Sequence, residues 1–497
     1  MQKAETVKYQ PQWFQNRRLI IGILACFFVA MLGIQLKFWS VLTLVLIIQI
    51  ILFILTFRRP VWAMAALLVG QFTASNYIWT LSAGTQISIR LVWTVMAVLI
   101  LIPLLKAQGG IKLGSGARSV IIPAAIFYIL ATIANAVNLD TTNTYQYLRT
   151  GITALTILFF LPALVKNEKD LKLLAIVILI TCTISSLAAI MQHYQYLGMP
   201  VFTLSGDTII PQNRTPGLAE SALYLAYELS IVILPMFALF FLKGVSRSAR
   251  IVLSVLALVM VAALYFTYTR SGMYSIIPGI MVMVFLLKGK MRKELLLIFI
   301  VITVGFLLYT NVTNNRYSRG FNDESSAAGR LVLWQAGVMI ALDNPILGIG
   351  QGRFMEIAQM YSGDVGSSAV PGAEGVLGTQ ENHNDFIRVW DSFGTPALLA
   401  YLWVFVSTFR NFYYGYRRST GPFLKAMALG GFAALTTYVV NAFMHNLMDS
   451  VPIFWILAGF SIAFVKLAEA PKPTTERVKT INVPEVKLLT DRPAPEP

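Results

Sequence analysis

Residues 171–192 read LKLLAIVILITCTISSLAAIMQ, and this stretch decides the fold class. Its one charged residue, Lys172, lies next to its start. A helix of about 20 apolar residues is long enough to cross the hydrocarbon core of a bilayer. Such runs recur near 19–36, 38–57, 61–80, 91–105, 119–138, 150–165, 171–192, 221–242, 251–268, 271–287, 294–311, 394–412, 424–445 and 451–468. We therefore predict an all-α, polytopic membrane protein with about fourteen transmembrane helices.

The composition supports this class and excludes others. Hydrophobic residues make up 57% of the 497 residues and charged residues only 12%, which is too apolar for a soluble core of this size. The net charge of +16 lies largely in short loops between the runs, without a basic patch interleaved with aromatic residues. We therefore expect no nucleic-acid partner. Both cysteines, Cys26 and Cys182, lie inside apolar runs, so they indicate neither a disulfide framework nor a metal site.

Positive charges alternate between the loops and predict the orientation. We place the N-terminus inside and take the run at 19–36 as an uncleaved first helix, because no small-residue cleavage site follows it. The inside loops then carry Arg58, Arg59, Lys106, Lys112, Arg118, Lys166, Lys169, Lys172, Lys243, Arg247, Arg250, Lys288, Lys290, Arg292, Lys293, Arg417, Arg418 and Lys425. An excess of Lys and Arg on the inside is what orients membrane helices.

The outside loops carry positive charge almost entirely as arginine. Their single lysine is Lys37. Their arginines are Arg90, Arg149, Arg214, Arg270, Arg316, Arg319, Arg330, Arg353 and Arg388. A guanidinium binds phosphate through two parallel hydrogen bonds, which an ammonium cannot do. The pattern therefore predicts that the outer face binds an anionic ligand.

The chain is predicted to have four parts. Residues 1–311 hold the first eleven spans and an outside loop at 193–220, and residues 312–393 form a large external loop with catalytic residues. Residues 394–468 hold the last three spans. Residues 469–497, rich in Pro, Glu, Lys and Thr, form a disordered cytoplasmic tail. The 312–393 loop is the one segment large enough for a small subdomain outside the membrane.

Within the large loop, GRLVLWQAGVMIALDNP (329–345) predicts a helix at the membrane surface that ends at Asp343, Asn344 and Pro345. Arg330 and Trp334 are one turn apart and share a face. The following GIGQGRF (348–354) is interpreted as a tight turn rather than a nucleotide loop, because no strand precedes it. Small residues without periodicity at 362–378 predict a mobile flap.

The segment QENHNDFIRVWDSFG (380–394) has helical spacing, which predicts His383, Ile387 and Trp390 on one face. The three histidines, His193, His383 and His445, all map to the outside. A histidine can accept a proton near neutral pH. A capping or headgroup-contacting role is the alternative for His383, and its arginine-rich surroundings favour a functional one. His193 and His445 lie at the ends of spans and are interpreted as interfacial.

Arg270 lies in YTRSGM (268–273), at a tight outside turn between two spans, and Arg214 lies in QNRTPG (212–217). Arg214 can contact a substrate or brace its loop, and for Arg149, at the start of a span, a structural and a functional role are equally supported. The outside face has few carboxylates and no HExxH, GxSxG or DxD motif. We therefore expect arginine rather than a metal ion to stabilise a departing diphosphate.

The order of these motifs resembles the O-antigen ligase and polymerase superfamily of bacterial envelope glycosyltransferases. The matching pieces are TRSG (269–272), GRLVLWQAGVMIALDNPILGIGQGRF (329–354), ENHNDFIRVWDSFG (381–394), HNLMDS (445–450) and FWILAGF (454–460). They cover the second half of the chain. The first half is similar only as generic spans.

The resemblance implies a GT-C-like fold in the bacterial inner membrane, with the active site facing the periplasm. It implies metal-independent, inverting transfer without a cofactor, from an undecaprenyl-diphosphate-linked oligosaccharide. By motif, the catalytic residues fall on Arg270, Arg330 and His383. Expected substrate contacts are Arg214, Arg149, Trp334, Asn384 and Arg388.

Four functions remain in order of preference, and the last is a purely structural or scaffolding membrane protein. The first is a polymerase of surface polysaccharide repeat units, whose acceptor is a second lipid-linked glycan. The second is a ligase that transfers the glycan to lipid A core. The third is a transporter or flippase, which is disfavoured because the charges gather at one interface and not at the bilayer midplane. Membrane lipids and a chain-length regulator are the further partners expected.

Overall fold

A computed structural model describes residues 40–73, 78–81, 85–88, 98–99, 101–103, 105–106, 110–138, 141–194, 214–219, 221–241, 245–312, 324–363, 375–448 and 452–470. Several predicted features lie outside these residues. They are the span at 19–36, most of the span at 91–105, Cys26, Lys37, Arg90, Arg316, Arg319, Lys243, and most of the 193–220 loop, the 362–378 flap and the tail.

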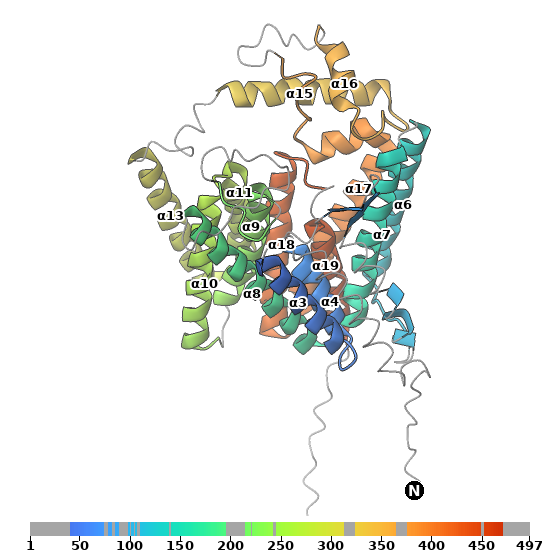
Figure 1. Cartoon of the computed structure of the whole chain (residues 1–497). Helices are drawn as coiled ribbons and strands as arrows, with labels where there is room; N and C mark the ends of the chain where they lie inside the picture. Colours follow the sequence, from blue (N-terminus) through green and yellow to red (C-terminus); the bar gives the residue numbers. More distant parts are fainter. Residues whose placement is uncertain are drawn as a thin grey trace, which may run out of the picture.

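The described chain is a bundle of helices (Figure 1). In order, the helices are α3 (Ser40–Leu55), α4 (Val61–Gln71), α6 (Ala117–Val137), α7 (Thr141–Leu164), α8 (Glu168–His193), α9 (Ala222–Phe240), α10 (Arg247–Phe266), α11 (Arg270–Tyr274), α12 (Ile276–Leu286), α13 (Gly289–Val312), α15 (Glu324–Asp343), α16 (Phe354–Ala358), the 3-10 helix η3 (Gln359–Tyr361), α17 (Asp385–Arg418), α18 (Pro422–Ala442) and α19 (Ile453–Glu469). Among the described residues, seven helices are long and apolar enough to cross a membrane: α6 to α10, α17 and α18. The helical class is confirmed, and the count of about fourteen spans stays a prediction.

Two predicted spans in the first half have other bounds in the structure. The run at 61–80 is not one helix, because α4 ends at Gln71 and strand β1 (Ile78–Leu81) follows. β1 pairs antiparallel with β2 (Thr85–Ser88), and these two short strands do not change the helical class. The β-branched and aromatic residues of this segment favour a strand over a helix. Helix α7 begins at Thr141, well before the predicted residue 150.

Small residues let α18 lie against two neighbouring helices. A Cβ added to Gly430 would lie 2.4 Å from the Cα of Pro235 in α9. A Cβ added to Gly431 would lie 2.2 Å from the Phe412 ring in α17. Glycine at such positions allows close approach of membrane helices. This packing fixes the middle of α18 between α9 and α17.

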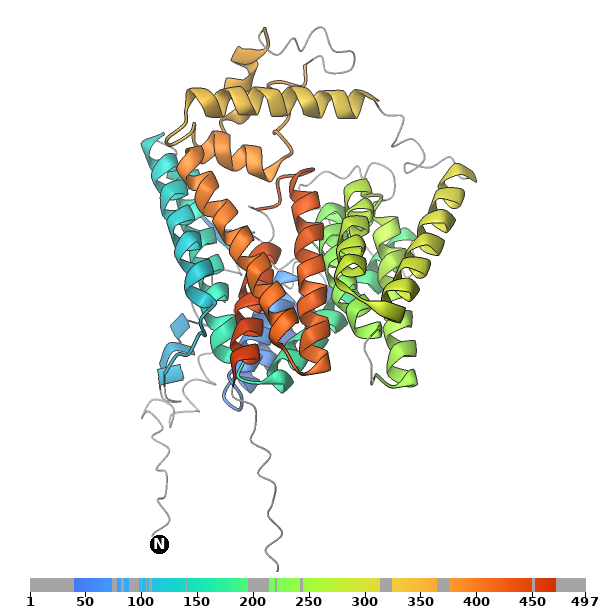
Figure 2. The same ribbon diagram turned by 180° about the vertical axis from the view of Figure 1, so that it is seen from behind.

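Helix α15 lies across one end of the bundle, nearly perpendicular to the other helices, as both views show (Figures 1 and 2). We call this the α15 end. Below it, α17 kinks at Gly394, whose φ is +81°. A Cβ there would lie 2.2 Å from the Ile346 carbonyl oxygen, and the Thr395 amide donates to the Pro345 carbonyl at 2.7 Å. The kink therefore joins the end of α15 to α17.

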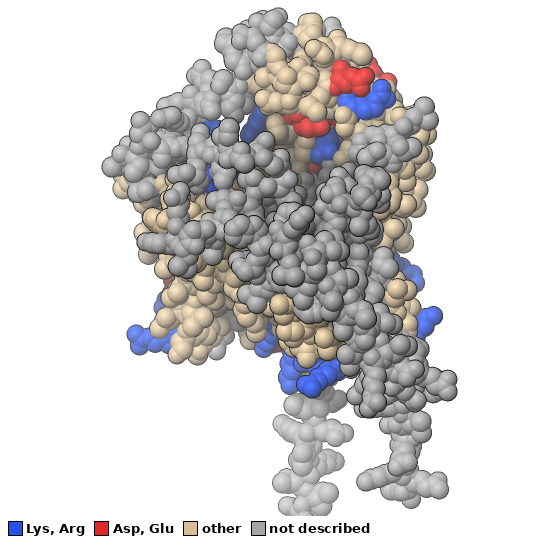
Figure 3. Space-filling view, viewed as in Figure 1, with Lys and Arg blue, Asp and Glu red and all other residues tan. Residues whose placement is uncertain are grey.

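Lysine and arginine gather at the opposite end of the bundle (Figure 3). There Arg59 forms an ion pair with Asp170, and the Lys466 ammonium donates to the carbonyls of Pro162 and Val165. This arrangement agrees with the predicted alternation of the loops. Which membrane face each end meets stays a prediction.

Candidate functional site

Arg270 is the first residue of α11 and follows a tight turn at Thr267–Thr269. Within this turn Tyr268 has a φ of +50°, which is unusual for a residue other than glycine. Arg214 reaches the turn from another segment: its Nε donates to the Thr267 carbonyl and its Nη2 to Thr269 Oγ1, both at 2.9 Å. Arg214 is therefore a brace for the turn that presents Arg270. Its contact with a substrate stays a prediction.

Helix α9 supports α11 from the side. A Cβ added to Gly272 would lie 2.8 Å from the Ala226 Cβ, so the two helices are in close contact. One residue further along α9, the Tyr227 hydroxyl lies 3.1 Å from Ser271 Oγ, and Tyr227 is 1% exposed. This hydrogen bond fixes the first turn of α11, and with it the backbone of Arg270.

Arg330 comes to the same place from α15. It is half-buried, and its Nη1 lies 3.5 Å from the Met444 sulfur. Burial lowers the pKa of Arg330, the nearby Tyr227 opposes this shift, and the positive charge of Arg270 lowers the pKa further. Arginine stays protonated in proteins, so two positive charges are held within range of each other. An anion bound near both would relieve their repulsion.

Two buried polar atoms beside these arginines have no hydrogen-bond partner among the residues the structure describes. They are the Trp334 Nε1, one turn after Arg330 on α15, and the Asn446 Oδ1, two residues after Met444. Buried polar groups are normally hydrogen-bonded, so each is a candidate contact for a ligand. Trp334 was predicted from the sequence. Asn446 was not.

His383 does not lie on a helix. The prediction that it shares a helical face with Ile387 and Trp390 is therefore wrong for His383. Helix α17 begins at Asp385, because the Asn384 side chain accepts from the amides of Phe386 and Ile387. Asn384 is 2% exposed, so its cap role is clear and its predicted substrate contact stays untested. His383 itself has a φ of +49°. Non-glycine residues in this conformation often mark functional sites.

The His383 ring lies beside that of His445, with ring centroids 5.5 Å apart. Burial and the Arg330 charge both lower the pKa of His383 from 6.5. Burial, followed by the charges of Arg330, His383 and Arg214, lowers the pKa of His445 to about 3. Both rings are therefore neutral near pH 7. A neutral His383 has one unprotonated ring nitrogen, which can accept a proton as a base.

The sequence interpretation missed His445 as a site residue. Its signal was a repeated pair: His445 and Asn446 repeat His383 and Asn384. Asp385 was missed as well. Its Oδ1 accepts from the amides of Leu447 and Met448 at 2.7 and 3.2 Å, which ties the segment after α18 to the start of α17.

Arg149 and Arg388 lie towards the kink of α17. Arg149 is half-buried on α7. Two residues before it, the Tyr147 ring lies against the Phe393 ring, with ring centroids 4.8 Å apart. Arg388 is half-buried on α17 and lies near the buried Asp391 carboxylate. The contacts given above for Arg270, Arg330 and His383 involve neither of them. Their roles as substrate contacts stay predictions.

The glycine-rich turn after α15 connects α15 to α17 and α6 through hydrogen bonds from its backbone amides. The amides of Ile349 and Gly350 donate to the carbonyls of Asp391 and Ser392 at 2.9 Å, and the Gln351 amide donates to Asn135 Oδ1 at 2.8 Å. Because protein acceptors take these amides, they do not form a phosphate cradle. This agrees with the interpretation as a tight turn.

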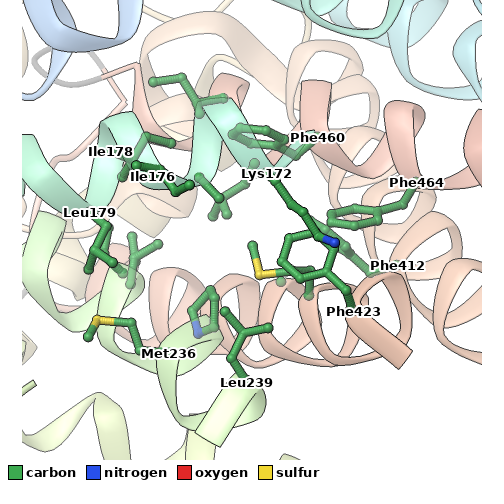
Figure 4. A pocket seen from close by; sticks show the side chains of 18 of the residues that line it. Lys172, Ile176, Ile178, Leu179, Met236, Leu239, Phe412, Phe423, Phe460 and Phe464 are labelled. Carbon is green, nitrogen blue, oxygen red and sulfur yellow. The ribbon is translucent and has the colours of Figure 1, made fainter. Parts of the chain in front are cut away.

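A separate apolar cavity of about 320 Å³ lies within the bundle (Figure 4). Residues of α8, α9, α18 and α19 line most of it, including Ile176, Leu179, Ile231, Met236, Phe423 and Phe460. Lys172 is its charged lining residue, pairs with Glu168 and lies over the Phe423 ring at 4.8 Å. Ile231 follows Tyr227 by one turn of α9. One lining residue of the cavity is therefore about one helical turn from Tyr227, whose ring lies beside His445.

Residues 253–402 match the protein family described as O-antigen ligase. The match runs from α10 into α17 and includes Arg270, Arg330 and His383. It confirms the resemblance on which the sequence interpretation relied. Arg214, Tyr227 and His445 lie outside the matched residues. No curated protein sequence matches the chain.

Proposed function

We propose that this chain, whose residues 253–402 match the O-antigen ligase family, is a membrane enzyme that transfers a glycan from undecaprenyl diphosphate at its α15 end. In this proposal the α15 end faces the periplasm, and the enzyme polymerises surface polysaccharide repeat units. The proposal is carried by a chain of contacts from Ser271, next to Arg270, through Tyr227 and His445 to His383. The Arg330 charge acts on both histidines, and its side chain contacts Met444, the residue before His445.

The reaction is a single displacement. The acceptor hydroxyl attacks the anomeric carbon, and the bond from that carbon to the diphosphate oxygen breaks. The electron pair leaves on the diphosphate, where Arg270 and Arg330 stabilise the added negative charge. His383 takes the proton of the attacking hydroxyl as the new glycosidic bond forms. Attack opposite the leaving group inverts the anomeric configuration.

The apolar cavity supports a lipid-linked donor. Its lining is hydrocarbon apart from Lys172, and it starts one turn of α9 below Tyr227. A diphosphate held by the two arginines would then have an apolar path for part of its polyprenyl chain. A soluble sugar nucleotide needs no such cavity, so this feature favours a lipid-linked donor.

A ligase is the second candidate, and the description of the matched family favours it. Ligase and polymerase share the donor, the arginines and the base, and differ in the acceptor. A transporter is a third candidate. Transport sites are formed at the bilayer midplane by broken helices. The cluster of Arg214, Arg270 and Arg330 instead lies at one end of the bundle.

One assay tests the proposal. Purified protein is given undecaprenyl-diphosphate oligosaccharide in the presence of EDTA, and the products are separated by size. A ladder of longer chains supports the polymerase. Product only after lipid A core is added supports the ligase, and no covalent product with either acceptor rules out both.

A further inference from the structure

His445 is held in a defined position after the end of α18. Its backbone amide donates to the Asn441 carbonyl at 3.0 Å. Two residues later, the amides of Leu447 and Met448 donate to the buried Asp385 carboxylate. The segment is therefore fixed on both sides of His445, and the second attachment is to the residue that starts α17. The backbone at His445 cannot move away from the start of α17 without breaking these bonds.

The His445 ring lies beside two groups of the proposed site. The His383 ring is one, with centroids 5.5 Å apart and ring planes at 69°. The Tyr227 ring is the other, with centroids 5.8 Å apart, and the Tyr227 hydroxyl lies 3.1 Å from Ser271 Oγ, next to Arg270. A chain of contacts thus runs from the helix of Arg270 to His383. His445 is its middle member.

The charges that face His445 oppose its protonation. Arg330 from α15 and Arg214 from the segment before α9 both act on its ring, and so does His383. The Asp385 carboxylate lies nearby but accepts from the backbone of Leu447 and Met448. A ring so placed contributes shape and excludes water, and it stays a neutral imidazole.

We propose that His445 is a positioning residue: its neutral ring packs against His383 and holds that imidazole, shielded from water, in the orientation that meets the acceptor hydroxyl. This inference rests on the proposed glycosyl transfer. It adds a residue outside the matched family segment and gives the second His-Asn pair a role different from that of the first.

The composition allows a direct test, because the chain has only three histidines. Histidine labelled with ¹³C and ¹⁵N gives three imidazole signals, which single substitutions assign. In the wild type, we expect His383 to titrate below 6.5. In His445→Ala, water reaches His383, and its titration moves up towards 6.5. His193→Ala is the matched control, since the His193 ring stacks on Phe266 at 4.0 Å, and it should leave His383 unchanged.

Kinetics give the second measurement. We expect His445→Ala to lower kcat on the order of 10-fold with little change in the donor KM, since misplacement of a catalytic group reduces rate. His445→Phe keeps a ring of similar shape, so both the His383 titration and kcat should stay near wild type. Size-exclusion profiles of all variants check folding.

Two results would overturn the proposal. One is a His445→Ala protein with the wild-type His383 titration and kcat. The other is a His445→Phe protein as inactive as His445→Ala, since this would mean that a ring nitrogen acts chemically. The titration needs no substrate. If the wild-type protein shows no transfer, the proposed function is overturned. The titration of His383 in His445→Ala still tests whether His445 shields His383 from water.

Discussion

The two ends of the bundle both carry positive charge, but their cations have different partners. At the opposite end, Arg59 pairs with Asp170, Lys172 with Glu168 and Lys290 with Glu294. At the α15 end, Arg214 binds hydroxyl and carbonyl oxygens, and Arg330 contacts a thioether. A carboxylate neutralises a cation, whereas the thioether that Arg330 contacts carries no charge. The comparison teaches that position alone does not define a binding arginine. Its partners do.

The largest effect should come from the two arginines at the α15 end. We expect Arg270→Ala or Arg330→Ala to lower the transfer rate by about 10²–10³, because each removes a donor that stabilises the departing diphosphate. Lysine at position 330 should not restore the rate, because it cannot form two parallel bonds. Chain-length ladders from cells and rates with purified enzyme measure the effect.

The matched control for this prediction is Lys290→Ala at the opposite end, where the side chain is 89% exposed. It should leave transfer unchanged, since an exposed ion pair contributes little. Normal glycan output from Arg330→Ala at wild-type expression would remove the distinction between the two ends.

The pH dependence should show the effect of the Arg330 charge on His383. The pKa of His383 is lowered from 6.5 by burial and by Arg330, and a base works only when unprotonated. The rate should therefore hold through pH 7 and fall about tenfold per pH unit below the lowered pKa. In Arg330→Gln the pKa rises, so the acid limb of the residual rate moves to higher pH. An acid limb at the same pH in both proteins would contradict the electrostatic link.

Arg214→Gln should have a smaller effect. The substitution removes two hydrogen bonds to the Thr267–Thr269 turn, each worth roughly 0.5–1.5 kcal/mol, so about tenfold in donor KM is expected. The change acts through the position of Arg270. A double-mutant cycle with Arg270→Ala measures this coupling, and fully additive effects would assign Arg214 a role of its own.

Much of the fold could be predicted because it depends on local pattern. Apolar runs located most of the long helices, and the Asp-Asn-Pro sequence predicted the end of α15 at Asp343. The predicted start of a span at residue 394 coincides with the kink at Gly394. The hairpin at 78–88 was missed because a short apolar run fits a strand as well as a helix.

The site could be predicted only in part. Arg270, Arg330 and His383 were found because residue type and motif identify them. The conformation of His383 was not, because an N-cap at Asn384 overrides the helical spacing. His445 lies beside His383 through contacts between distant segments, which no local periodicity reports. Asp385 was missed for the same reason, since its partners are Leu447 and Met448.

The smallest predicted effect separates the cavity from the lipid-facing surface around it. Ile176 and Ile180 are one turn apart on α8 and are 54% and 53% exposed, but only Ile176 is among the residues lining the cavity. Ile176→Trp should narrow the apolar path and raise the KM for a long polyprenyl donor by roughly threefold, the low end of what a misfit in an apolar pocket costs. Ile180→Trp adds the same ring outside the cavity and should leave this KM unchanged. A donor with a short lipid chain should respond to neither substitution, since it would not reach the cavity. An equal response of both variants would instead place the donor chain on the outer surface of α8.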